Sequence, residues 1–221
     1  MMADTTTMAE SFRTLLMQSQ DKCQTLHPSS NLGDLTVPPR VFPYDTGNIR
    51  DWYDMDKASV LGSGSSSTMF KCFERGTTSK PPYACKVIPK ADPFNTFPRI
   101  RHEVKIMFAL QHQPNIITLH DVFEDADYVY LVMELGNGGE LLEDFNRRFR
   151  KADPAQRPLP PLYSEAEAAS IMFQIMSAIR ACQSVGVVHR DIKPENVLIV
   201  DKDENGFPII KVIDFGLSTF T

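Results

Sequence analysis

Apolar and polar residues are patterned most clearly near the end of the chain, where they predict a β-hairpin. Two apolar runs, residues 197–200 and 209–213, flank a polar stretch that contains Asn205-Gly206. Asn-Gly between two apolar runs is a strong signal for a tight turn between antiparallel strands. The sequence therefore predicts a two-stranded hairpin here.

The polar stretch of this hairpin, D-K-D-E-N-G at residues 201–206, also matches the first half of a calcium-binding loop. That loop needs a bidentate glutamate at its twelfth position and a helix on each side. The twelfth position here is Val212, and predicted strands flank the stretch. We interpret it as a solvated hairpin turn.

A lysine in an apolar strand and a glutamate in the following helix form a candidate pair. The strand Y-A-C-K-V-I places Lys86 on one face with Ala84 and Ile88. The helix R-I-R-H-E-V-K-I-M-F-A-L begins after Pro98 and carries Glu103 on its apolar face. A buried lysine is costly unless it is paired. Two unrelated charges that reach solvent are the alternative.

Two further strands are predicted at residues 115–123 and 128–135, joined by the acidic turn 124–127. The second strand ends in G-N-G-G at residues 136–139, and glycine tolerates backbone conformations that other residues avoid. This glycine-rich stretch is a natural hinge between two lobes.

Two helices are predicted after the hinge. The first covers residues 140–151, and a proline-rich stretch at 154–162 follows, which we interpret as a surface insertion rather than a site for an SH3-type domain. Ser164 and Glu167 form a capping box that opens a long amphipathic helix closed by Gly186. The apolar stripe predicted for this helix comprises Ala168, Met172, Ile175, Ile179 and Cys182.

The first part of the chain has little apolar periodicity. Residues 1–45 are rich in Thr, Ser, Gln, Asn and Pro, which predicts a largely disordered tail, with a short helix at 9–20 and a docking role as alternatives. From Trp52 to residue 72 the pattern is strand, glycine-serine turn and strand. Such small residues let backbone N–H groups approach phosphates closely. An ordinary loop without a phosphate-binding role would have the same sequence pattern.

Composition narrows the function classes. Apolar residues make up 42% of the chain and charged residues 23%, as in soluble globular proteins. The net charge of −5 argues against a nucleic-acid partner and favours a basic protein or peptide substrate. The four cysteines have no pair spacing, so we expect no disulfides and a cytoplasmic or nuclear location. No apolar run reaches the ~20 residues that span a membrane, so no membrane insertion is expected.

The candidate chemistry lies around the hairpin, in V-V-H-R-D-I-K-P-E-N-V-L-I-V and V-I-D-F-G. Asp191, Asn196 and Asp214 supply oxygen ligands that suit Mg²⁺. These stretches match the catalytic loop H-R-D-x-K-x-x-N and the metal-binding D-F-G of protein kinases, so the chain resembles a protein kinase. The passages H-Q-P-N-I-I-T-L-H-D-V-F and L-V-M-E-L-G-N-G-G-E-L resemble the calcium- and calmodulin-dependent Ser/Thr kinases in particular.

The resemblance implies an α+β, two-lobe, protein-kinase-like fold. A small antiparallel β lobe with one main helix would occupy residues 46–137, after the tail at 1–45. An incomplete, mainly helical large lobe would occupy residues 138–221. The implied reaction moves the γ-phosphate of Mg·ATP to Ser/Thr hydroxyls of protein substrates, with ATP and Mg²⁺ as cofactors.

The resemblance also implies residue roles. Asp191 would accept the proton of the incoming hydroxyl, and Lys193 would touch the transferred phosphate. Lys86 would bind the ATP phosphates and Glu103 would hold Lys86 in place. Asn196 and Asp214 would bind Mg²⁺. Met107, Leu119, His189 and Phe215 match an apolar spine that links the lobes.

Nucleotide contacts are implied for a larger set. Met133 would line the back of the adenine pocket, and the backbone of Glu134 and Gly136 would bind the adenine edge. Glu140 and Glu195 match acidic positions that favour arginine upstream of the phosphoacceptor. The full set implied to contact nucleotide is Leu61, Gly62, Ser63, Gly64, Ser65, Ser66, Ser67, Thr68, Met69, Ala84, Lys86, Met133, Glu134, Gly136, Glu140 and Leu198.

The glycine-rich loop departs from the kinase pattern G-x-G-x-x-G-x-V. Ser67 replaces the third glycine, Met69 replaces the valine, and Ser66 stands where many kinases carry an aromatic residue. We expect this loop to cover phosphates but to hold ATP less tightly.

Three interpretations stay open at this point. The chain stops at Thr221, five residues after Gly216, where the resembled domain continues into its activation segment and A-P-E motif. It could be a C-terminally truncated Ser/Thr kinase, a kinase-like nucleotide- or partner-binding protein without phosphotransfer, or a translation product without function. The five intact residues of the implied machinery favour the first, and residues 1–221 alone are expected to transfer little phosphate.

Overall fold

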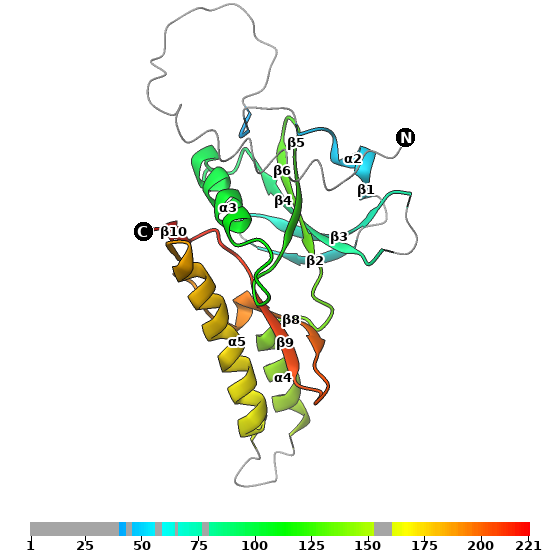
Figure 1. Ribbon diagram of the computed structural model, residues 1–221. Coiled ribbons are helices and arrows are strands. Elements are labelled where there is room, and N and C mark those ends of the chain that lie inside the picture. The colour runs from blue at the N-terminus through cyan, green and yellow to red at the C-terminus, as the bar shows by residue number, and fades with distance from the viewer. Residues whose placement is uncertain (1–39, 43–45, 56–58, 65, 77–79, 153–160) are drawn as a thin grey trace, which may run out of the picture.

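The computed structural model describes residues 40–42, 46–55, 59–64, 66–76, 80–152 and 161–221 (Figure 1). The expectations for the helix at 9–20, for Cys23, for Ser65 and for most of the proline-rich stretch lie outside these residues. The described part has two lobes, an antiparallel sheet with one long helix and a second lobe of two helices and a hairpin (Figure 1). This is the α+β two-lobe arrangement that the sequence predicts.

The small lobe is built on one antiparallel sheet in the order β1-β3-β4-β6-β5, with β2 paired to β3. The expected strand around Trp52 is instead the end of a short helix, which Asn48 caps by accepting the Arg50 N–H. The elements are α2 (Ile49–Trp52), β1 (Tyr53–Asp54), β2 (Val60–Ser63), β3 (Thr68–Glu74), β4 (Tyr83–Pro89), α3 (Phe97–Ala109), β5 (Leu119–Glu124) and β6 (Tyr128–Glu134).

Alternation along β4 gives the sheet two different faces. Cys85 is fully buried in a cluster with Tyr53, Phe123 and Val132 on one face. Lys86 lies on the other face, toward the cavity described below. The strand pattern of the sequence is therefore confirmed.

The second lobe contains the predicted hairpin. Its strands are β8 (Val197–Lys202) and β9 (Pro208–Val212), which pair antiparallel. Asp203 Oδ1 accepts the N–H groups of Asn205 and Phe207 at 2.9 and 2.8 Å, and Gly206 has a φ of +78°. The acidic stretch thus folds on itself as a turn, as expected. The other elements are α4 (Leu141–Lys151), α5 (Glu165–Ser184), β7 (Val187–Val188), the 3₁₀ helix η2 (Pro194–Asn196) and β10 (Thr219–Phe220).

The stripe predicted for α5 is only partly correct: Cys182 is buried and Ile175 and Ile179 are half-buried, as expected, but its first half is wrong. Ala168 and Met172 are exposed, the latter by 55%, while the buried residues are Glu167, Ile171, Ala178 and Cys182. Polar contacts rotate the helix to this face. The Arg148 guanidinium donates to Glu167 at 2.7 Å, and Gln174 accepts the Ile210 N–H of β9 at 2.9 Å.

The capping box of α5 is only half formed. Ser164 Oγ accepts the Glu167 N–H at 3.1 Å, as the sequence predicts. The Glu167 carboxylate binds Arg148 of α4 at 2.7 and 3.0 Å instead of returning to the Ser164 backbone. Side-chain pairing between the two helices decides where this carboxylate goes.

The two lobes are joined by main-chain and side-chain contacts. The Val212 N–H donates to the Asn115 carbonyl at 2.9 Å, and the Ile117 N–H donates to the Val212 carbonyl at 3.0 Å. The expected strand at 115–123 therefore starts only at Leu119, because the residues before it pair with β9. Lys211 also pairs with Glu134 at 2.5 Å.

Within the described residues, no helix has the length and apolar character needed to cross a membrane.

Glycine is required at one point of the hinge. A Cβ at Gly138 would lie 2.6–2.8 Å from Ile199 of β8, closer than packed atoms approach. The Gly138 N–H donates to the Ile199 carbonyl at 2.8 Å. Close backbone contact between hinge and hairpin therefore depends on the missing side chain.

Candidate active site

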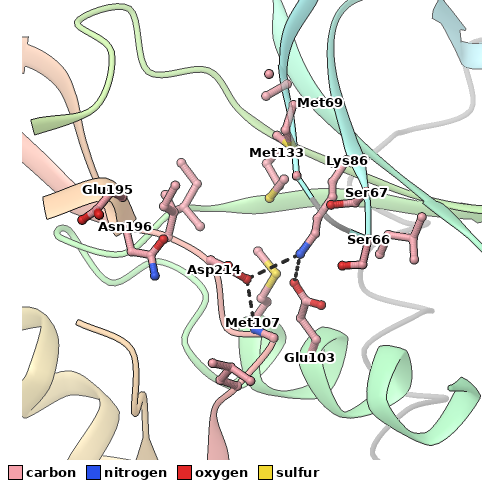
Figure 2. Close-up of a pocket in the computed structure, with 18 of the residues that line it drawn as sticks. Ser66, Ser67, Met69, Lys86, Glu103, Met107, Met133, Glu195, Asn196 and Asp214 are labelled. Carbon is pink, nitrogen blue, oxygen red and sulfur yellow. Dashed lines mark hydrogen bonds and ion pairs between the residues drawn. The ribbon is translucent and has the colours of Figure 1, made fainter. Parts of the chain in front are cut away.

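A cavity of about 610 Å³ opens between the lobes. β2, β3, β4 and α3 line one side of it, and the end of β6, Glu140, η2, β8 and the D-F-G stretch line the other (Figure 2). The sequence-predicted residues that line this cavity are Gly62, Ser63, Gly64, Ser66, Ser67, Met69, Ala84, Lys86, Glu103, Met133, Glu134, Glu140, Lys193, Glu195, Asn196, Leu198 and Asp214.

Four predicted site residues, Leu61, Thr68, Gly136 and Asp191, are not part of the lining of this cavity. Leu61 is 46% exposed on β2, and Thr68 opens β3 opposite Val87. Gly136 also lies behind the lining, where an added Cβ would be 3.2 Å from Leu198.

Lys86 and Glu103 form the ion pair that the sequence predicts. Lys86 Nζ lies 2.6 Å from Glu103 Oε1 and 3.6 Å from Asp214 Oδ1, and Figure 2 shows the ammonium between the two carboxylates. The Lys86 and Glu103 side chains are only 16% and 8% exposed. Burial acts to lower the pKa of Lys86, but the nearby carboxylates of Glu103 and Asp214 outweigh it, so the pKa is raised. The lysine stays charged, ready to bind an anion.

The serine-rich turn closes over the cavity. The Gly64 N–H donates to the Ser67 carbonyl at 2.9 Å and holds the turn tight. Asn95, which is buried, donates to the Ser66 carbonyl at 2.8 Å and to the Pro89 carbonyl at 2.9 Å. The turn is thus tied to the loop before α3, and this role of Asn95 was not predicted.

The inner end of the cavity is apolar. Ala84 pairs across strands with Met133, and Leu198 faces them from β8. The Glu134 N–H already donates to the Thr118 carbonyl at 3.1 Å. The Glu134 N–H is therefore not free for a ligand, whereas the Glu134 carbonyl oxygen could accept a hydrogen bond from an amino group. The slot fits a flat, mostly apolar ring with polar edges.

The catalytic loop is held together by Asn196. Its Nδ2 donates to the Asp191 carbonyl at 2.9 Å and to Asp191 Oδ2 at 2.8 Å. Lys193 Nζ lies 2.9 Å from Asp191 Oδ2. Hydrogen bonds from Lys193 and Asn196 lower the pKa of Asp191, so this side chain is a carboxylate near neutral pH. It can accept a hydrogen bond from a hydroxyl group.

The D-F-G stretch adopts a backbone that places Asp214 at the cavity. Asp214 has a φ of +61°, a left-handed conformation in which Asp is over-represented. Its Oδ1 accepts the Gly216 N–H at 3.2 Å. The rings of His189 and Phe215 meet edge to face at 4.8 Å, and His189 Nε2 lies 3.0 Å from the Ile213 carbonyl. Burial lowers the pKa of His189, which favours the neutral ring with its Nε2–H on this carbonyl.

Asn196 and Asp214 fit a magnesium ion. Both line the cavity, and the two Nδ2 hydrogen bonds leave Asn196 Oδ1 as the oxygen ligand. No group of three or more His, Cys, Asp or Glu side chains within the described residues could hold a metal by itself. Mg²⁺ usually takes one or two protein ligands and completes its shell with water and substrate phosphates. The Asn196 and Asp214 oxygens therefore fit the number and type of protein ligands that Mg²⁺ usually takes.

Comparison with known protein families shows to which family this chain belongs. The family model described as the protein kinase domain matches residues 55–221, which is most of the chain and includes every residue that lines the cavity. The chain belongs to the protein kinase family.

Curated relatives of this kinase domain include calcium-dependent protein kinases of plants. Calcium-dependent protein kinase 25 of Arabidopsis thaliana is 40% identical over 177 residues, which is 79% of this chain and 31% of the relative. Calcium-dependent protein kinase 4 of Solanum tuberosum is 40% identical over 182 residues, covering 81% and 29%. The chain thus spans about a third of the length of these relatives. The similarity supports a serine/threonine protein kinase.

Besides Asn95, the sequence did not predict the roles of two further side chains near the kinase site. Arg99 Nε donates to the Gly216 carbonyl at 3.1 Å and connects α3 to the D-F-G stretch. Lys211 pairs with Glu134 across the lobes. Both are charged residues next to predicted elements, and no local pattern identifies their distant partners.

Proposed function

We propose that this kinase domain transfers the γ-phosphate of Mg·ATP to serine or threonine hydroxyls of protein substrates. The observation that carries the proposal is that Lys86 Nζ lies 2.6 Å from Glu103 and 3.6 Å from Asp214 on a cavity also lined by Lys193 and Asn196. Phosphoryl transfer depends mainly on positioning and on neutralising phosphate charge, and these residues supply both.

Each residue has a task that follows from its contacts. Lys86, fixed by Glu103, binds phosphate oxygens from the small-lobe side. Asp191, held by Asn196 and Lys193, accepts the hydrogen bond of the attacking hydroxyl and orients its oxygen. When the negatively charged phosphate groups bind, the Lys193 ammonium moves from Asp191 to the phosphate that is transferred. When bound by Asn196 and Asp214, Mg²⁺ supplies further neutralisation of phosphate charge.

The substrate class follows from acidic side chains at the rim. Glu140 and Glu195 both line the cavity. Burial first, and then the charges of Glu143 and Glu195, raise the pKa of Glu140. A cationic side chain placed there would relieve this repulsion, so peptides with arginine upstream of the phosphoacceptor are the proposed substrates.

The proposed location is the cytoplasm or nucleus. Cys72, Cys85 and Cys182 are free and buried in the described part of the chain. Free thiols are compatible with a reducing compartment.

A transfer assay separates this proposal from a kinase-like protein that only binds nucleotide. Residues 1–221 are incubated with γ-labelled ATP, Mg²⁺ and two serine peptides that differ only in one upstream arginine. Transfer by the wild-type chain, at whatever rate, should fall by about 10²–10⁴ in Asp191→Asn, the usual contribution of a positioned base. The peptide with arginine should be preferred, and Glu140→Ala should reduce that preference.

Asp201→Asn is the matched control, because Asp201 is an exposed aspartate on the hairpin away from the cavity. It should keep wild-type transfer. Label incorporation that persists unchanged in Asp191→Asn contradicts the assigned role. Because little transfer is expected from residues 1–221, the assay uses a high chain concentration and a long incubation. Nucleotide binding without any transfer to either peptide under these conditions favours the alternative.

A further inference from the structure

A short segment before the small lobe is buried, although the sequence predicts disorder there. Val41 and Phe42 are 0% exposed and belong to the main apolar cluster of the molecule. Their N–H groups donate to the two carboxylate oxygens of Glu124 at 2.5 and 2.9 Å. Figure 1 shows this short blue stretch near the end of β5 and the start of α3. The segment is docked by both backbone and side chains.

Glu124 connects the segment to the start of α3. Its Oε1 also pairs with Lys90 at 2.6 Å, and the two side chains are only 3% and 7% exposed. Lys90 Nζ lies 5.9 Å from the centre of the Phe97 ring, the first residue of α3. A buried carboxylate is costly unless its hydrogen bonds are complete. The backbone of residues 41 and 42 supplies two of the three donors named here.

The burial of α3 extends beyond the face that carries Glu103. A helix turns about 100° per residue, so Val104 and Phe108 lie roughly 100° and 140° around the axis from Glu103. Both are buried, at 0% and 2% exposure, in the same cluster as Val41 and Phe42. A helix resting on one surface buries a stripe little wider than about 100°. The far side of α3 therefore needs a second cover, and Val41 and Phe42 are fully buried apolar side chains of the same cluster.

The start of α3 has little stabilisation of its own. Thr96 is the N-cap residue but makes no side-chain capping bond, and the first turn has no acidic residue. Arg99 and Arg101 lie near this end, where positive charge opposes the helix dipole. The position of the helix therefore depends on contacts with other parts of the chain.

We propose that residues 40–42 are a positioning element that holds α3 against the sheet and thereby keeps Glu103 on Lys86. Its effect on nucleotide binding rests on the proposed function, whereas its effect on α3 does not. When the segment is released, α3 moves or frays and Lys86 loses its partner for part of the time. The apparent affinity for Mg·ATP then falls in proportion to the fraction of chains with the helix in place.

Hydrogen exchange of the full chain tests the proposal without nucleotide. In Phe42→Ala, amides of residues 100–108 should exchange at least about tenfold faster, while those of α5 and of β8–β9 stay as in the wild type. Phe42→Leu, which restores most of the apolar volume, should restore slow exchange. Phe149→Ala is the control, since Phe149 is 54% exposed on α4.

A second variant avoids a cavity in the core. Glu124→Gln keeps the shape of the side chain but removes the charge that binds Lys90 and both N–H groups, and should also speed exchange in α3. In both variants the Kd for Mg·ATP should rise several-fold. Unchanged α3 exchange in both variants overturns the proposal. If the wild-type chain shows no binding of Mg·ATP, the proposed function is overturned instead. The hydrogen-exchange data still decide whether the segment positions α3.

Discussion

Lys86→Met is expected to abolish the thermal stabilisation that Mg·ATP gives to the wild-type chain. A ligand at about 100 times its Kd adds ~2.7 kcal/mol to the free energy of unfolding. In a chain of this size that corresponds to a rise in Tm of roughly 5–10 °C. Lys86 is the buried cation that faces the phosphate end of the cavity, so methionine removes its charge while keeping much of its volume.

The variant also needs a test that its fold survives. Loss of Lys86 leaves Glu103, whose side chain is only 8% exposed, without its partner, and breaking such a pair costs about 3–5 kcal/mol. The double variant Lys86→Met/Glu103→Leu removes both charges, and should regain stability without regaining the nucleotide response. Lys105→Met, a half-buried lysine of α3, should keep the full shift. If Mg·ATP raises the Tm of Lys86→Met as much as that of the wild type, Lys86 is not the lysine that binds the phosphates.

The second large effect concerns magnesium. Nucleotide binding to the wild-type chain should be much tighter with Mg²⁺ than with EDTA, and Asp214→Asn should lose this difference. The Asp214 carboxylate is 48% exposed, so the substitution leaves the fold intact while it removes a charged oxygen ligand. We expect the Mg²⁺ dependence of the Kd to fall at least about tenfold, the scale of losses seen around metal sites. Calorimetric titration with and without EDTA measures it.

Asp201→Asn again serves as the matched control, and should retain the Mg²⁺ dependence. If Asp214→Asn binds nucleotide with the same Mg²⁺ dependence as the wild type, then Asp214 is not a metal ligand. The assignment of Asn196 as its companion would then lose its main support.

The parts of the site that follow from local patterns could be predicted from the sequence. Strand alternation put Lys86 on the cavity face, and helical phase put Glu103 on the inward face of α3. Asn205-Gly206 determined the hairpin that carries Leu198 and leads to Asp214. In each case the side-chain direction depends only on the backbone period of one element.

The parts that the sequence did not reveal depend on contacts between distant segments. The phase of α5 follows from Arg148 reaching Glu167 and from Gln174 binding β9. The late start of β5 follows from main-chain pairing of Asn115 with Val212. Val41 and Phe42 lie in a stretch of polar and proline residues, and only the apolar surface that they cover explains their burial.

The most direct test of the nucleotide site is covalent labelling with an acyl phosphate of ATP. A lysine amine close to the phosphates attacks the acyl carbonyl, an amide forms and ATP leaves. The two lysines that line the cavity are Lys86 and Lys193 among the described residues. We expect mass spectrometry to find the label on these two, with protection by excess Mg·ATP. Label spread over surface lysines without protection would contradict an ATP site between the lobes.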